Sequence, residues 1–289
     1  MLTSRRDNVY GYIFITPALL VLAGFFTYPI LKTLYLSFTE WNLLSAPRLM
    51  GLKNYLDLFV SDDFYKSLWI TIYYVFGTTL MTIPVAFLLA LALNAAGRSQ
   101  GFFKGVFFVP VVLSTVIASV LWVSIYHPYS GIMKLLPLPA ALRVQSWYQR
   151  PDLVVPGLIV FTLWKGVGLY TVIFLAAIIN IPSSYIEAAQ IDGASFFKLL
   201  GRIVIPILKP IFLFTMVICV VYSFENFAIV YTSTKGGPNS FSKILSILIF
   251  ENGFKYFKMG YASALAVIQF IIMFVFSYIQ FKVFKSEVE

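Results

Sequence analysis

The sequence predicts an all-α membrane protein that crosses the bilayer six times. Of its 289 residues, 60% are hydrophobic and only 11% are charged, and the mean hydropathy is +0.87. A soluble domain carries about a quarter charged residues. Six long apolar stretches follow one another along the chain, and none alternates with period two as a transmembrane strand does. Composition and pattern together therefore favour a polytopic helical protein over a soluble domain.

Each of the six stretches is long enough to be a transmembrane helix, because a hydrocarbon core of about 30 Å requires about 20 helical residues. Several contain proline, which membrane helices tolerate when neighbouring groups bond the freed carbonyls. We predict spans at residues 12–34, 68–93, 106–125, 153–179, 207–230 and 262–283.

The charge and the cysteine content exclude other classes. The net charge is +9, and the basic residues are scattered between the apolar stretches, which favours anchoring at lipid headgroups over binding to nucleic acid. The chain has one cysteine, Cys219, and one histidine, His127, which excludes a disulfide framework and disfavours a His/Cys metal site. We expect Cys219 to face lipid or to fill the core.

A polar segment at residues 184–210 separates the fourth and fifth apolar stretches. Ser184, followed three residues later by Glu187, forms a capping box, which predicts a helix that begins at Tyr185. Gly193 then breaks or bends the chain, and a second amphipathic stretch, 196–204, follows. Such a helix–glycine–helix arrangement between two membrane spans indicates a surface that another protein holds from outside the bilayer. We call residues 181–206 the elbow.

The spacing within the elbow resembles the EAA loop of ABC importer permease subunits. Its pattern is Glu187-Ala188-Ala189, three residues, Gly193, nine residues, and then Ile203-Val204-Ile205-Pro206. Three further segments resemble the sugar-importing branch of that family: Gly51-Leu52-Lys53-Asn54-Tyr55, Gly236-Gly237-Pro238 and Gly260-Tyr261-Ala262-Ser263-Ala264. The resemblance covers nearly the whole chain. It implies a type I ABC importer permease fold in which residues 1–289 form a single transmembrane domain.

The chain lacks the Gly-x-x-x-x-Gly-Lys-Ser/Thr motif that holds ATP phosphates, and it shows no catalytic constellation. We therefore expect a non-catalytic subunit with no cofactor of its own, and ATP and Mg²⁺ on separate ATPase subunits. The resemblance makes the elbow a coupling helix. The residues that it implies for contact with an ATPase subunit are Glu187, Ala188, Ala189, Asp192 and Gly193.

The resemblance also implies the rest of the assembly. A second homologous permease subunit and two cytoplasmic ATPase subunits complete the importer, and an extracytoplasmic solute-binding protein delivers substrate to the loops at 37–66 and 231–261. The expected substrate is a sugar, either an oligosaccharide or a related polyol or glycerol phosphate. The expected location is a bacterial or archaeal cytoplasmic membrane, with the elbow and both termini in the cytoplasm.

Two charged residues fall within the predicted spans away from their ends: Lys165 in the fourth and Glu225 in the fifth. A charge at membrane depth costs on the order of 3 kcal/mol on insertion scales, so it normally faces a bundle interior or a water-filled path. Polar and aromatic neighbours suit a sugar, because its hydroxyls form hydrogen bonds while its ring packs on aromatic faces. With Lys165 and Glu225, the predicted substrate-binding residues are their neighbours Thr162, Trp164, Tyr222, Ser223 and Asn226. The resemblance to maltose-type permeases also implies Thr162, Lys165 and Ser223, and it adds Gly166 and Leu169.

Alternatives remain open for these residues. Lys165 and Glu225 form either a structural ion pair between two helices or the proton relay of an ion-gradient-driven secondary transporter. Lys165 alone also suits an anionic substrate group such as a phosphate or a uronate, and Trp164 suits packing against a neighbouring span. Maltose-type relatives have asparagine and tyrosine contacts where this chain has Thr162, Leu169 and Ser223, so the resemblance does not point to maltose itself.

Overall fold

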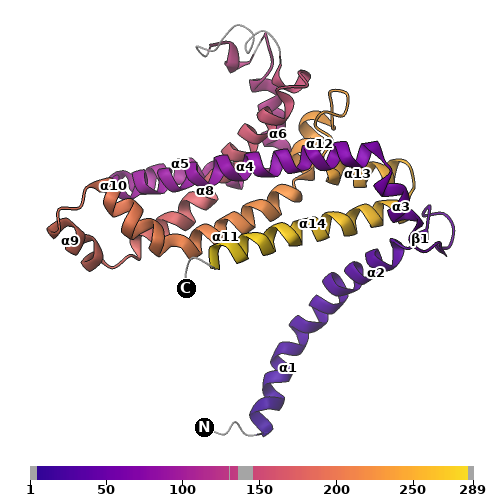
Figure 1. Cartoon of the computed structure of the whole chain (residues 1–289), viewed down its shortest axis with the longest axis horizontal. Helices are drawn as coiled ribbons and strands as arrows, with labels where there is room; N and C mark the ends of the chain where they lie inside the picture. Colours follow the sequence, from indigo (N-terminus) through magenta and orange to yellow (C-terminus); the bar gives the residue numbers. More distant parts are fainter. Residues whose placement is uncertain (1–4, 130, 136–145, 286–289) are drawn as a thin grey trace. The chain divides into compact units, whose positions relative to one another are not determined.

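The computed structural model describes residues 5–129, 131–135 and 146–285, and these residues are almost entirely helical. The chain divides into two compact units. The first comprises Met1–Asp62 and Leu248–Phe270, and the second comprises Asp63–Ile247 and Ile271–Glu289. Figure 1 shows the course of the chain through both. We describe each unit by itself.

The first unit contains an uninterrupted N-terminal helix and a small sheet. Strands β1 and β2 pair antiparallel, with Thr39 opposite Leu49 and Glu40 opposite Arg48. The elements in chain order are α1 (Arg5–Leu22), a π-helical turn (Ala23–Thr27), α2 (Tyr28–Leu36), β1 (Thr39–Glu40), β2 (Arg48–Leu49), α3 (Lys53–Phe59), the end of α13 (Leu245–Phe250), a π-helical turn (Glu251–Lys255) and the start of α14 (Met259–Lys285).

Asn54 holds this unit together. Its buried side-chain amide donates to the carbonyls of Ser37 and Thr39, both at 2.9 Å. Gly260 approaches the same strand so closely that a Cβ atom there would overlap the Thr39 carbonyl. The Gly51–Tyr55 and Gly260 motifs of the sequence therefore meet at β1, and both have a structural role here. Gly51 itself has φ +68°, which only glycine adopts without strain.

The second unit is a bundle of longer helices in which α8 packs against both α5 and α11. The rings of Phe87, Phe174 and Phe212 pack against one another with centroids 4.7–5.5 Å apart, and they join α4, α8 and α11. The elements are α4 (Asp62–Ala95), a 3-10 turn (Gly97–Ser99), α5 (Gln100–Val112), α6 (Thr115–Ile125), 3-10 turns (Ile132–Leu135 and Trp147–Gln149), α8 (Val154–Ile179), α9 (Ser183–Ile191), α10 (Phe196–Leu199), a π-helical turn (Leu200–Val204), α11 (Ile205–Phe224), α12 (Phe227–Thr234) and the remainder of α14.

Five helices in the described ranges are long and apolar enough to cross a membrane, and a bent pair makes a sixth span. The five are Tyr12–Leu36, Asp62–Ala95, Val154–Ile179, Phe196–Phe224 and Met259–Val283, and the pair is Gly97–Val112 with Thr115–Ile125. The predicted all-α fold with six spans is confirmed.

Two of the predicted ranges differ from the observed helices. The range 106–125 is not one straight helix, because the backbone is extended at Leu113 and Ser114 and the two halves meet at 99°. The range 207–230 starts too late and ends too late. Its helix already begins at Phe196 and stops at Phe224, and Asn226 separates it from α12.

The elbow contains two helices separated at Gly193, as predicted. Gly193 has φ +71° and donates its N–H to the Gln190 carbonyl at 3.0 Å, the left-handed conformation that ends many helices. The predicted capping box is wrong. Helix α9 begins at Ser183 after Pro182, and no side chain caps it, because the proline fixes the first turn and places Ser184 within the helix. Figure 1 shows α9 and α10 at one end of the second unit.

Candidate functional site

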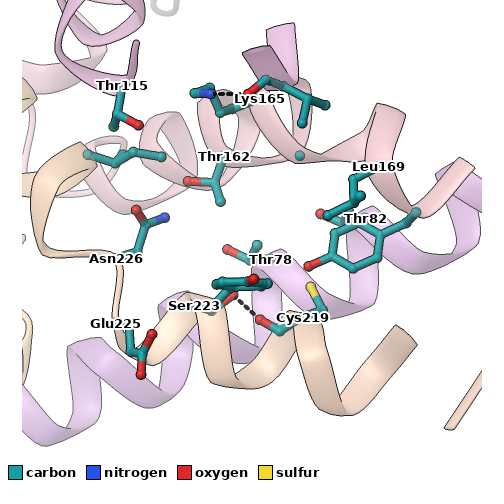
Figure 2. A pocket seen from close by; sticks show the side chains of 15 residues that line it. Thr78, Thr82, Thr115, Thr162, Lys165, Leu169, Cys219, Ser223, Glu225 and Asn226 are labelled. Carbon is teal, nitrogen blue, oxygen red and sulfur yellow. Dashed lines mark hydrogen bonds between the residues drawn. The ribbon is translucent and has the colours of Figure 1, made fainter. Parts of the chain in front are cut away.

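The second unit contains a partly open cavity of about 400 Å³ between its helices (Figure 2). This volume lies within the range of small-molecule sites, about 300–1,000 Å³. The lining side chains come from α4, α5, α6, α8, α11 and α12, so the cavity lies between membrane spans. They are Thr78, Thr82, Val111, Thr115, Thr162, Lys165, Gly166, Leu169, Tyr170, Cys219, Tyr222, Ser223, Glu225, Asn226 and Ile229.

Eight of the nine predicted substrate-binding residues line this cavity. They are Thr162, Lys165, Gly166, Leu169, Tyr222, Ser223, Glu225 and Asn226. Trp164 is the exception, because its ring packs beside those of Trp122 and Phe161 at centroid distances of 5.6 and 6.4 Å. Trp164 therefore belongs to the aromatic core, which was its alternative interpretation.

A hydrogen-bonded chain joins two lining side chains, Thr162 and Asn226, through the buried Tyr74. Asn226 Nδ2 donates to the Tyr74 hydroxyl at 2.6 Å, and that hydroxyl lies 2.6 Å from Thr162 Oγ1. Thr162 donates its own proton to the Leu158 carbonyl at 2.8 Å, so Tyr74 is the donor to Thr162. The chain fixes Asn226, at the break between α11 and α12, to the two helices α4 and α8.

Lys165 is held by the backbone of a neighbouring helix. Its Nζ donates to the carbonyl oxygens of Pro110 at 2.9 Å and Val111 at 3.1 Å. Both carbonyls lie in the last turn of α5, where a helix leaves its final carbonyls without intrahelical partners. Within the described residues no ion pair joins Lys165 to Glu225, so the structural ion-pair alternative is wrong. Close packing of α5 on α8 supports this contact, since a Cβ at Gly168 would overlap the Phe107 carbonyl.

The sequence argument missed several lining residues. Thr78 and Thr82 come from α4, whose predicted span at 68–93 contains no charge to mark a polar face, although their spacing of four places them on one face. Cys219 is 2% exposed and lines the cavity. Of the two positions expected for it, the lipid-facing one is therefore wrong and the buried one is correct. The other missed residues are Val111, Thr115, Tyr170 and Ile229.

The elbow presents a second surface, outside the apolar spans. Four of the five predicted coupling residues are exposed, namely Glu187, Ala188, Asp192 and Gly193, whereas Ala189 is buried. Large apolar side chains are exposed beside them, including Ile191 at 86% and Phe197 at 81%. Exposed apolar groups rimmed by polar ones are typical of protein-binding surfaces.

A helical membrane protein with a polar cavity between its spans, and a polar elbow that carries exposed apolar groups, has the features of a transport permease. Comparison with known proteins identifies the class more closely. Residues 64–287 match the family model described as "Binding-protein-dependent transport system inner membrane component". The chain belongs to this family, and it is an ABC importer permease.

Several curated relatives match almost the whole chain. The probable ABC transporter permease protein YesP of Bacillus subtilis is 34% identical over 282 residues, covering 96% of this chain and 91% of the relative. The arabinooligosaccharides transport system permease protein AraP of the same organism is 30% identical, with coverages of 98% and 93%. The multiple sugar-binding transport system permease protein MsmF of Streptococcus mutans is 29% identical, with 97% of each chain covered.

Solved structures share the fold. A chain of a bacterial ABC transporter involved in the import of the acidic polysaccharide alginate superposes with a TM-score of 0.84, at 21% identity, covering 99% of this chain and 98% of the other. A second structure, of a bacterial alginate ABC transporter in complex with an alginate-pentasaccharide-bound periplasmic protein, gives a TM-score of 0.82 at 23% identity.

Proposed function

We propose that this chain forms half of the translocation path of an ATP-driven importer for a carbohydrate, with the cavity of the second unit as its substrate site. The observation that carries the proposal is the polar lining of that cavity, in which hydroxyl and amide groups from α4, α8 and α11 converge between membrane spans. Neutral hydrogen-bonding groups beside aromatic side chains such as Tyr222 suit a polyhydroxylated ring. Relatives named for arabinooligosaccharides and multiple sugars support this substrate class.

The importer needs subunits beyond this chain. We expect a second homologous permease to close the path, and two ATPase subunits, carrying ATP and Mg²⁺, to bind the elbow through Glu187, Ala188, Asp192, Gly193 and the exposed Ile191. We expect a solute-binding protein at the opposite side of the membrane, at the loops 37–66 and 231–261. A structural relative bound to its periplasmic protein supports that partner. With six spans, both termini lie in the cytoplasm with the elbow.

Family membership favours this function over the ion-gradient-driven transporter. That alternative required Lys165 and Glu225 to exchange a proton, and Lys165 instead donates to two backbone carbonyls. Glu225 lies at an exposed position after the last turn of α11. The two residues remain candidates for the substrate site, but the structure does not join them in a relay.

The test is uptake by the complete importer in proteoliposomes. The chain is purified with the proteins that co-purify from native membranes, and labelled arabinotriose, maltotriose, trehalose and sn-glycerol 3-phosphate are offered with the binding protein. We expect that at least one sugar is taken up and that its uptake requires ATP inside the proteoliposomes. Uptake by this chain alone, driven by an ion gradient and indifferent to ATP, would overturn the proposal.

A further inference from the structure

Helix α4 contributes hydroxyl groups to the cavity that the protein itself does not use. Thr82 is 1% exposed and Thr78 is 2% exposed, and both line the cavity. Neither Oγ1 atom forms a hydrogen bond of good geometry within the described part of the chain. Figure 2 shows both side chains around the cavity together with Thr162 and Ser223.

This arrangement is unusual for threonine within a helix of this protein. Thr71, two turns before Thr78 on the same helix, donates to the carbonyl four residues before it at 2.6 Å, and Thr162 of α8 does the same at 2.8 Å. A threonine hydroxyl in a membrane helix normally finds that partner. The hydroxyls of Thr78 and Thr82 lack it, and so does that of Thr79 on the same helix. Of these three threonines, Thr78 and Thr82 line the cavity and Thr79 does not.

A buried hydroxyl without a partner destabilises the folded chain, so such groups are generally satisfied by water or by a ligand. The two threonines are four residues apart, which places them on one face of α4 about 6 Å from each other along the helix axis. That separation suits a ligand with several hydroxyl groups, because each hydroxyl both donates and accepts, as threonine does.

Lys165, the one basic residue in the lining of the cavity, already donates hydrogen bonds to the protein backbone. Two of the three donors of the Lys165 ammonium group point to the carbonyls of Pro110 and Val111. The carbonyl oxygens stabilise its charge without a substrate anion, and Glu225, the acidic lining residue, opposes anion binding. The lining as a whole therefore favours neutral hydroxyl groups over a phosphate or a uronate.

We propose that Thr78 and Thr82 of α4 are substrate-contacting residues, which form a third binding wall beside those of α8 and α11 and select a neutral, polyhydroxylated sugar. This inference rests on the proposed function, since it names the substrate class and two further contacts of the same cavity. We expect water to form hydrogen bonds with these two hydroxyls between transport cycles, and sugar hydroxyls to replace it.

The test compares valine and serine variants in the purified complete membrane complex without its binding protein. Valine keeps the shape of threonine and removes the hydroxyl, whereas serine keeps the hydroxyl. The probes are the labelled sugar that the wild type takes up best and labelled sn-glycerol 3-phosphate. We expect Thr82→Val and Thr78→Val each to raise the dissociation constant of the sugar about 3- to 10-fold, and the serine variants to stay close to the wild type.

Thr79→Val is the matched control. Thr79 is buried on the same helix at 4% exposure but does not line the cavity, so its variant should bind the sugar as the wild type does. The inference is overturned if both valine variants bind normally, if serine loses as much affinity as valine, if the transported sugar does not bind the complex directly, or if the phosphate probe binds best. Wild-type uptake is measured separately, and its absence for every sugar would refute the proposed function itself.

Discussion

The ammonium group of Lys165 lies 2.9 Å from the carbonyl oxygen of Pro110, 55 residues earlier in the chain. This bond, with its neighbour to Val111, connects the middle of α8 to the end of α5, directly before the 99° bend into α6. These carbonyls lie at the end of α5, where they have no partner within the helix, so they accept hydrogen bonds from the ammonium group. The contact stabilises a charged lysine within the membrane without an ion pair to a carboxylate.

We therefore expect Lys165→Met to destabilise the protein. The substitution removes two hydrogen bonds and leaves carbonyls at the end of α5 without donors, a loss of about 1.5–3 kcal/mol. Lys165→Gln, which keeps an amide donor, should lose less. Thermal unfolding of the detergent-purified complex measures the effect. A Met variant of normal stability and altered substrate range would instead assign Lys165 to substrate recognition.

The close approach of Gly168 to α5 leads to a second prediction about the same pair of helices. A Cβ atom there would overlap the Phe107 carbonyl of α5, so Gly168→Ala should push α5 from α8 and cost about 1–3 kcal/mol. Gly105→Ala on α5 is the matched control, because a Cβ atom there would meet nothing within 4 Å beyond the local backbone of its own helix. The control should unfold at the wild-type temperature or slightly above it. Equal unfolding temperatures for the two variants would show that the close approach is not required.

The elbow should tolerate change at one position and not at others. Gly193→Pro forces φ to about −65° at a residue with φ +71°, and Glu187→Ala removes an exposed carboxylate. We expect both variants to reach the membrane in normal amounts and to lose most ATP-dependent uptake. Ser184→Ala is the control, because α9 has no side-chain cap to lose. Normal uptake in both test variants would count against a coupling role for the elbow.

Cys219 supplies a built-in probe of the cavity. It is the one cysteine of the chain, and it lines the cavity on α11. A small, water-soluble methanethiosulfonate reagent should modify it slowly, and a saturating concentration of the transported sugar should slow that reaction several-fold. Mass spectrometry of the peptide that contains Cys219 measures both rates, and Cys219→Ser gives the background. Labelling that sugar leaves unchanged would place Cys219 outside the substrate path.

The spans were predictable because a bilayer leaves the backbone few options. A chain must satisfy its own N–H and C=O groups there, so long apolar stretches become helices. The breaks were not predictable in the same way. No glycine marks Leu113–Ser114, and the carbonyls just before the bend accept hydrogen bonds from Lys165, far along the sequence. Local sequence does not contain that contact.

The cavity was predictable in part for a similar reason. Lys165 and Glu225 stand out in apolar stretches, and their polar neighbours followed from helical spacing, whereas Gly166 and Leu169 followed only from the resemblance to maltose-type permeases. Thr78 and Thr82 do not stand out, because threonine is common in membrane helices and normally bonds to its own backbone. Only the fold shows that their hydroxyls lack that bond. Trp164 shows the converse, since an aromatic residue between site residues points to the core.

One continuous helix from Phe196 to Phe224 connects the elbow to the cavity. At 1.5 Å per residue, about 40 Å of continuous helix separates Phe196 from Ser223. A rod of this length acts as a lever, and tilting it by about 5° about its elbow end would displace Ser223 by about 3–4 Å. That distance exceeds the length of a hydrogen bond, so under the proposed function a small rotation that an ATPase subunit imposes on α10 would break the contacts between a sugar and α11.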